Sequence, residues 1–247
     1  MSEGIDPARQ LAQHVASLRA AGVEWIGIAP PLPAPEPVQV QASLFAAAPP
    51  EEATEGGDRR VALEMLRKQV ASCTRCPQLA ATRTQTVFGV GPLDPEVCFV
   101  GEAPGADEDR TGIPFVGAAG QLLDRILAAS GLKRDEVGIV NVLRCRPPGN
   151  RKPEPDEAAN CEEWLTKTLE LMRPKLLVAL GGSATKFLLG VETGITRLRG
   201  RWLEWRGIPV LCTFHPSYLL RNPDAKRDVW EDMKSLLARM GRPVPGK

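Results

Sequence analysis

Four of the six cysteines are spaced as a metal-binding set. Cys73 and Cys76 form a Cys-x2-Cys pair, and Cys145 and Cys161 follow with fifteen residues between them. Four thiolates are the ligands of a structural zinc ion or of a 4Fe–4S cluster. The spacing alone leaves both open, because a zinc ribbon usually has two close pairs and this chain has one.

The other two cysteines, Cys98 and Cys212, have apolar neighbours and are expected to be small buried hydrophobes. No apolar run approaches the ~20 residues of a membrane span. The first ten residues, MSEGIDPARQ, lack the basic and apolar regions of a secretory signal. We therefore expect a reducing cytoplasm, where such thiols are core residues or metal ligands rather than disulfides.

Unusual polar sequences follow four short apolar runs that are typical of buried strands. The runs cover residues 97–101, 138–143, 175–181 and 208–214. The sequences that follow them are GEAPG, RCRPPGN, GGSAT and HPSYLLR. Because parallel strands end at one edge of a sheet, where ligands bind, we expect these four loops to form the active site.

Helical patterns alternate with these strands, which predicts how the loops are positioned. The patterns lie near residues 118–130, 156–172, 183–189 and 223–240, and a further helix is expected from near Arg59 to Cys73. Alternation of this kind predicts an α/β fold with three α/β/α layers around a central four-stranded parallel sheet.

The chain divides near residue 60 into a head and a body. Residues 7–22 have the apolar spacing of a helix, and residues 29–58, rich in Pro, Ala and Glu, are expected to form a disordered linker. We therefore predict an N-terminal segment over 1–59 and a catalytic domain over 60–242. The whole chain has a net charge of +1, but 3 Lys+Arg and 8 Asp+Glu give residues 1–59 a net charge of −5, which leaves +6 on the rest. Such asymmetry suggests a polyanionic partner.

Several long motifs resemble the family 4 uracil-DNA glycosylases. The run GEAPGADEDRTGIPFVGAAGQLLDRIL, residues 101–127, resembles their first motif, and HPSYLLR, residues 215–221, resembles their second. Residues 141–153 and the cysteine spacing match as well, so the resemblance covers roughly residues 60–240. It implies the glycosylase fold and an enzyme that flips uracil out of DNA and hydrolyses its N-glycosidic bond. The abasic product would then enter base excision repair.

The resemblance also implies that the metal site is a 4Fe–4S cluster rather than zinc. Its ligands would be Cys73, Cys76, Cys145 and Cys161. The cluster would be structural, since no redox step on the substrate follows from it.

Three residues are implied to read the flipped base. The ring of Phe115 would stack on uracil, as aromatic side chains do at roughly 1–3 kcal/mol per base. The amide of Asn141 can pair with uracil O4 and N3–H, whereas cytosine inverts this pattern. His215 would bind O2 and stabilise the developing negative charge, which a neutral imidazole can do.

Two carboxylates and one backbone position complete the predicted pocket. Glu102 is the candidate for positioning water or supporting the cationic sugar. Glu108 is assigned to uracil binding, with the alternative that it caps a helix or holds the Phe115 loop. The backbone of Ala103 can contact the base, because the flanking glycines permit close approach.

DNA contacts are expected around the same edge. Ser183, at the start of a helix, and Ser217 are candidates for phosphate binding. Leu219 or Leu220 is expected to wedge into the base stack behind the flipped nucleotide. Four basic residues supply charge there: Arg146, Arg151, Lys152 and Arg221.

Two related groups and a different class of function are alternatives to this family. Family 5 enzymes lack an acidic residue where this chain has Glu102. A third group has Gln where this chain has Ala103 and uses a histidine in a basic loop to bond DNA covalently, but no histidine lies between His14 and His215. The alternative to an enzyme is a non-catalytic iron–sulfur DNA-binding protein, which need not keep the base-reading residues.

The head contains a peptide that suggests a protein partner. Gln41, Leu44 and Phe45 resemble the bacterial sliding-clamp-binding pentapeptide, within the predicted linker. The alternative is a hydrophobic stretch that packs on the body. We expect a monomer that works on the DNA of the bacterial nucleoid.

Overall fold

The computed structural model describes residues 7–22 and 53–246, in two compact units divided between Pro50 and Glu51. In the first unit, α1 (Pro7–Ala20) is the helix that the apolar spacing predicts. Most of the predicted linker, including the Gln41–Phe45 peptide, lies outside the described residues. In the second unit, α2 (Ala53–Ala71) begins earlier than the predicted start near Arg59. No helix in the described part of the chain is long and apolar enough to cross a membrane.

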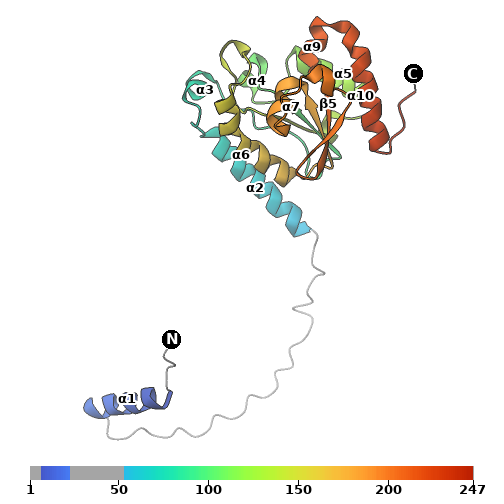
Figure 1. Cartoon of the computed structure of the whole chain (residues 1–247). Coiled ribbons are helices and arrows are strands. Elements are labelled where there is room, and N and C mark those ends of the chain that lie inside the picture. The colour runs from blue at the N-terminus through green and yellow to red at the C-terminus, as the bar shows by residue number, and fades with distance from the viewer. Residues whose placement is uncertain (1–6, 23–52, 247) are drawn as a thin grey trace. The chain divides into compact units, whose positions relative to one another are not determined.

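A five-stranded sheet with the order β2-β1-β3-β5-β4 forms the centre of the second unit (Figure 1). The strands are β1 (Val97–Gly101), β2 (Gly138–Asn141), β3 (Leu176–Leu180), β4 (Trp202–Trp205) and β5 (Ile208–Thr213). The four predicted strands are present and run parallel, as expected. Every residue of β1, β2 and β3 is buried, because helices cover both faces of a parallel sheet.

The edge strand β4 pairs antiparallel with β5 and was not predicted. Its residues are partly exposed, so it lacks the continuous apolar run by which the other strands were recognised. Arg206 and Gly207 join the two strands with φ of 48° and 83°. Positive φ at both residues is the signature of a type I′ hairpin, and the arginine–glycine pair was the signal that could have revealed it.

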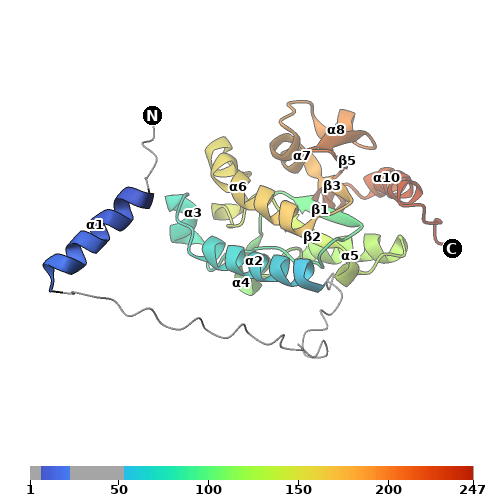
Figure 2. The same ribbon diagram turned by 90° about the horizontal axis from the view of Figure 1, so that it is seen from below.

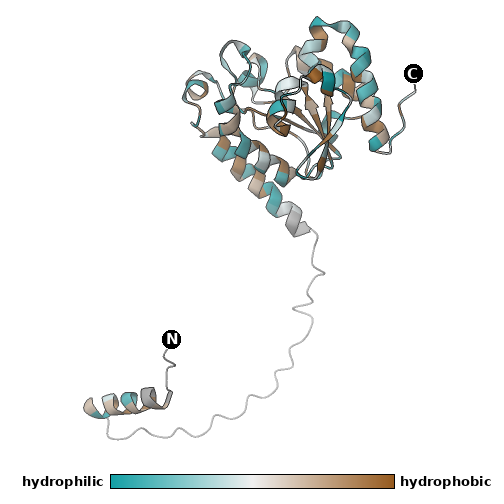
Figure 3. Cartoon of the chain, viewed as in Figure 1, coloured by the Kyte–Doolittle hydropathy of each residue, from teal (hydrophilic) through white to brown (hydrophobic). Residues whose placement is uncertain are grey.

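Helices cover the two faces of the sheet (Figure 2) and pack with its strands in two hydrophobic clusters. The first face packs against α2, α6 (Pro155–Met172) and α7 (Gly181–Leu189), and the second against α5 (Ala118–Ala129) and α10 (Lys226–Arg239). Along β1, Cys98 and Val100 join the first cluster, whereas Val97 and Phe99 join the second. The three predicted layers are therefore present, with hydrophobic strands between helices whose outer faces are largely hydrophilic (Figure 3).

The parallel strands end together, which places their following loops at one edge. In the sheet register Gly101 of β1 lies beside Asn141 of β2, and Leu180 of β3 lies beside Thr213 of β5. The short helical elements of the second unit are α3 (Pro77–Thr82), α4 (Ala106–Thr111), η1 (Arg134–Glu136), η2 (Pro148–Asn150), α8 (Ile195–Leu198), α9 (Pro216–Arg221) and η3 (Pro223–Ala225).

A buried ionic network fastens the end of β5 to α10. Asp232 of α10 is 2 % exposed and accepts hydrogen bonds from Thr213 Oγ1 at 2.7 Å and Arg199 Nη2 at 2.6 Å. The charge of Asp232 is thus compensated, as a buried carboxylate requires. Because Thr213 is followed by Phe214 and His215, this network fixes where the last loop leaves the sheet.

Candidate active site and cysteine cluster

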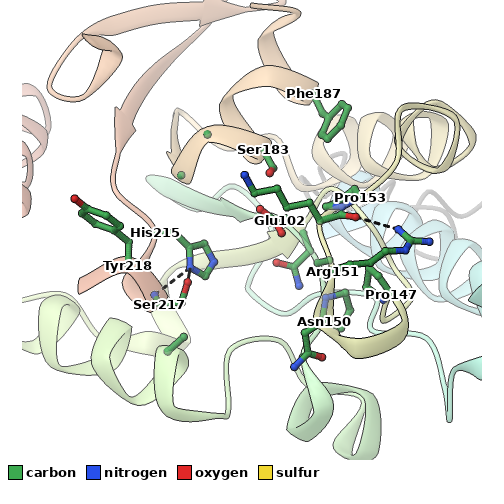
Figure 4. Close-up of a pocket in the computed structure, with 18 of the residues that line it drawn as sticks. Glu102, Pro147, Asn150, Arg151, Pro153, Ser183, Phe187, His215, Ser217 and Tyr218 are labelled. Atoms are coloured by element: carbon green, nitrogen blue, oxygen red, sulfur yellow. Dashed lines mark hydrogen bonds between the residues drawn. The ribbon is translucent and has the colours of Figure 1, made fainter. Parts of the chain in front are cut away.

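A cavity of about 760 Å³ opens at the edge where the parallel strands end (Figure 4). All four predicted loops contribute to its wall. Eleven of the residues predicted for the base and DNA sites line it: Glu102, Ala103, Glu108, Phe115, Asn141, Arg151, Lys152, Ser183, His215, Ser217 and Arg221. The predicted residues Arg146, Leu219 and Leu220 do not line it.

Phe115 is held in a strained backbone conformation beside two glycines. Its φ is 52°, in the left-handed region that bulky residues rarely adopt, and such strain is typical of functional sites. A Cβ on Gly120 would lie 1.9 Å from the Phe115 carbonyl oxygen, and one on Gly101 would lie 2.6 Å from its ring. Only glycine at these two positions lets the ring and its loop pack into place.

Glu108 holds the loop that carries Phe115. Its Oε1 accepts from the backbone N–H of Val116 and of Gly117, both at 2.9 Å, and its Oε2 accepts from Gly105 N–H at 3.0 Å. The last bond belongs to the capping box of α4. The geometry supports the predicted alternative, capping a helix and holding this loop, while direct uracil binding by Glu108 stays a prediction.

Asn141 ends β2 and presents an unpaired acceptor. The side chain is 2 % exposed, and its Oδ1 is buried with no hydrogen-bond partner in the described part of the chain. An unsatisfied buried polar atom costs about 1–3 kcal/mol, so an atom of this kind in a cavity wall needs a partner such as water or a ligand. A bound molecule with a hydrogen-bond donor would satisfy it.

His215 is fixed as a neutral donor. Its Nδ1 accepts from Ser217 N–H at 3.1 Å and lies 2.8 Å from Ser217 Oγ, which leaves the proton on Nε2 (Figure 4). Burial lowers the pKa of the imidazole to about 4, and the Arg221 charge acts in the same direction. Gly181 packs against this residue, since a Cβ there would lie 2.8 Å from His215 Cβ.

Glu102 follows β1 and lines the same cavity as Asn141 and His215. Within the described residues, its carboxylate has neither a hydrogen bond nor an ion pair. A carboxylate without a protein partner in a cavity is free to orient water or to face a developing cation.

The two leucines of α9 have opposite environments. Leu219 is fully buried in the second hydrophobic cluster, whereas Leu220 is 44 % exposed. A buried side chain cannot enter a base stack without leaving the core. The Leu219 assignment therefore does not fit this packing. Leu220, the other predicted candidate, is the exposed leucine of α9.

The four predicted cations differ in how they are bound. Arg151 forms a two-pronged pair with Glu157 at 2.6 and 2.9 Å, and Arg146 donates to Asn150 Oδ1 at 2.8 Å. Both therefore stabilise the loop after β2. Lys152 and Arg221 are exposed and, among the described residues, make no ion pair, so they are available to a ligand at the cavity.

The four predicted metal-ligating cysteines gather at the first hydrophobic cluster. Cys145 and Cys161 belong to its core, and Cys73 and Cys76 pack against it. Burial raises the pKa of the Cys161 thiol to about 11, and the nearby Cys145 and Cys76 add to the rise. Across the described residues, no three His, Cys, Asp or Glu side chains form a group that could hold a metal ion.

Three of the four sulfurs accept a hydrogen bond from an N–H donor that sequence reasoning missed. Cys145 Sγ accepts from Arg83 at 3.0 Å and Cys73 Sγ from Trp164 at 3.4 Å. The third donor is the Asn160 amide, 3.6 Å from Cys76 Sγ. N–H bonds stabilise thiolates, so this donor set suits sulfurs that carry negative charge.

Arg144 adds a buried cation beside these thiols. It is 1 % exposed and donates to the Phe88 carbonyl at 2.5 Å and to Thr168 Oγ1 at 3.0 Å. Burial lowers its pKa to about 10, while the neighbouring Cys161 opposes that shift. An arginine next to a cysteine in an apolar strand end was the signal that could have revealed it, because buried charges need a partner.

We predict that His215 stays neutral well below pH 6.5. NMR of the ring nitrogens should show the Nε2–H tautomer at pH 7 and a titration near pH 4. The imidazole of the unfolded chain takes up a proton near pH 6.5, whereas that of the folded chain does so only near pH 4. The folded state is therefore unaffected by this group above pH 6.5 and loses stability as the pH falls from 6.5 towards 4. A Ser217→Ala variant keeps its backbone N–H and should keep the tautomer. An imidazolium at pH 6 would contradict this assignment.

Comparisons with known proteins agree with this geometry. The profile described as "Uracil DNA glycosylase superfamily" matches residues 88–234, more than half of the chain. A type-4 uracil-DNA glycosylase of Thermotoga maritima is 45 % identical over 190 residues, covering 74 % of this chain and 98 % of the relative. The type-4 enzyme of Archaeoglobus fulgidus is 40 % identical over 191 residues, covering 74 % and 96 %. A type-5 uracil-DNA glycosylase of Pyrobaculum aerophilum is 32 % identical, covering 69 % and 88 %. The chain therefore belongs to the uracil DNA glycosylase superfamily.

Proposed function

We propose that this protein is a uracil-DNA glycosylase that hydrolyses the N-glycosidic bond of a flipped deoxyuridine. The observation that carries the proposal is the pairing of two groups in one cavity: the unpartnered buried Oδ1 of Asn141 and the neutral N–H donor of His215. Uracil offers the matching partners, an N3–H donor and a carbonyl acceptor at O2. The predicted alternative, a DNA-binding protein without activity, would not need Asn141 and His215 to be arranged in this way.

Each of the cavity residues has its own role in the reaction. Phe115 stacks on the base, and Asn141 reads its edge. As the glycosidic bond lengthens, negative charge grows on uracil O2, and the N–H of His215 stabilises it without transferring a proton. Glu102 faces the developing sugar cation and orients the attacking water. As the C1′–N1 bond breaks and the new C1′–O bond forms, uracil leaves as its anion and the proton of the water passes to the Glu102 carboxylate.

DNA is held around the rim. The free cations Lys152 and Arg221 bind phosphates flanking the flipped nucleotide, with Ser183 and Ser217 as further candidates. The exposed Leu220 fills the gap in the stack. Residues that contact phosphate alone add affinity without sequence preference, which suits an enzyme that must recognise one base in any context. The enzyme acts as a monomer on the DNA of the nucleoid.

The activity is tested with an oligonucleotide containing one uracil, treated with alkali after incubation. Wild type should give a cleaved strand. His215→Ala removes the donor at the developing charge and should lower the rate about 10²–10³-fold. Asn141→Ala removes a buried hydrogen bond worth about 1–3 kcal/mol and should cost about 5–150-fold. His14→Ala, on the exposed face of α1, is the matched control and should leave the rate unchanged. An uncut strand at enzyme excess would falsify the proposal.

We further propose that Cys73, Cys76, Cys145 and Cys161 hold a 4Fe–4S cluster. The support for this is that all four cysteines lie in or against one hydrophobic cluster and that three of their sulfurs accept a hydrogen bond from an N–H donor. When bound, the cluster supplies structural cross-linking of α3, the loop after β2 and α6. The buried Arg144 cation offsets part of the thiolate charge.

Iron and acid-labile sulfide measure this cluster independently of activity. Anaerobically purified protein should contain about four of each per chain, as the cluster formula requires. Cys161→Ser should lower iron content and visible absorption, because it removes a thiolate ligand. Cys212→Ala, which changes a buried thiol within β5, is the control and should retain full iron. Zinc in place of iron would overturn the assignment.

Clamp binding through Gln41, Leu44 and Phe45 is the remaining proposal for a partner. These residues lie outside the described part of the chain, so the support is the peptide resemblance alone. In a pull-down with a bacterial sliding clamp, wild type should be retained and a Leu44→Ala, Phe45→Ala variant should not. Equal retention of both proteins would rule the contact out.

A further inference from the structure

The cavity is larger than one flipped base requires. Cavities of roughly 300–1,000 Å³ enclose drug-sized ligands, and this one measures about 760 Å³. Uracil is a single six-membered ring. In Figure 4, Phe187 and Pro153 lie on the opposite side of Glu102 and Ser183 from His215 and Tyr218. The cavity thus continues well beyond the residues that read uracil.

The far part of the cavity is suited to an uncharged flat ring. Phe187 is half-buried, lines the cavity and packs against the first hydrophobic cluster. Pro153 and Ile195 add apolar wall beside it. Of the two lysines that line the cavity, Lys186 donates to Glu192 at 2.9 Å. Lys152, next to Pro153 in the sequence, makes no ion pair among the described residues and can bind the phosphate beside such a ring. An apolar wall with an aromatic ring favours a nucleobase over a phosphate.

Phe187 is also correctly spaced from a candidate phosphate contact. Ser183 lies four residues earlier on α7, so the two side chains share one face of the helix. Four residues rise about 6 Å along a helix, a distance that one nucleotide spans. A nucleotide whose phosphate is bound at Ser183 can therefore place its base on Phe187.

We propose that Phe187 is a stacking platform for the nucleobase adjacent to the flipped uracil, so that the cavity binds a dinucleotide. This inference rests on the proposed glycosylase function and extends it to a second subsite. Stacking on an aromatic side chain tolerates any base, so the subsite adds affinity for the strand rather than sequence preference.

The test uses single-stranded oligonucleotides with one uracil whose 5′ or 3′ neighbour is either adenine or an abasic spacer. For wild type, removing the base on one of the two sides should lower kcat/KM about 5–150-fold. Phe187→Leu keeps apolar volume but removes the ring. It should show a similar loss with the adenine neighbour and no further loss with the spacer.

Two other variants separate stacking from core packing. Phe187→Tyr keeps a ring and should retain the dependence on the neighbouring base. Trp205→Leu changes another half-buried aromatic residue that packs on the same cluster away from the cavity, and it should respond to the spacer as wild type does. If Phe187→Leu lowers kcat/KM equally with an adenine neighbour and with a spacer, the subsite proposal is wrong. It is also wrong if the kcat/KM of wild type does not change with a spacer on either side. Absence of uracil release by wild type would instead overturn the glycosylase function itself.

Discussion

The active site depends on the bare α-carbon of Gly101. A Cβ at this position would lie 2.3 Å from Asn141 Oδ1 and 2.6 Å from the Phe115 ring. Real Cβ atoms do not approach other atoms so closely, so any side chain would displace both groups. The end of β1 therefore packs directly against the side chains of Phe115 and Asn141, which we propose contact the base. Gly120 and Gly181 serve the same purpose for the Phe115 backbone and for His215.

Backbone amides hold the polar groups around the end of β1. Three N–H groups bind the carboxylate of Glu108 and fix the loop that carries Phe115. One N–H binds His215 Nδ1 and selects its neutral tautomer. Because the donors belong to the main chain, they need little reorganisation as charge develops, which is the condition for strong electrostatic stabilisation. The buried Asp232 network extends this rigidity to the end of β5.

The loop after β2 joins the cavity to the cysteine cluster. It carries Cys145 at its start and cavity-lining residues at its end. Arg151 binds Glu157 of α6 and Gln78 of α3, and these two helices contain or adjoin the other three cysteines. The cluster region thus shares a wall with the substrate cavity. The cations of this loop differ in their contacts: Arg146 and Arg151 stabilise the loop, whereas Lys152 makes no ion pair with any residue that the structure describes.

The sequence by itself determined the four parallel strands, the helices between them and the edge where the site lies. Continuous apolar runs such as residues 97–101 can only be buried, and GEAPG and HPSYLLR are too unusual to be ordinary loops. Partly exposed β4 escaped prediction because sheet pairing, not its own hydrophobicity, defines it. Only the tertiary structure decided which side chains are free. Leu219 is buried in the core whereas its neighbour Leu220 is exposed. Arg151 is held in an ion pair with Glu157, whereas Lys152 forms no ion pair within the described residues. The type of a residue limits the chemistry that it can perform. Whether its side chain is available to a substrate depends on its contacts with distant segments, which only the folded chain brings together.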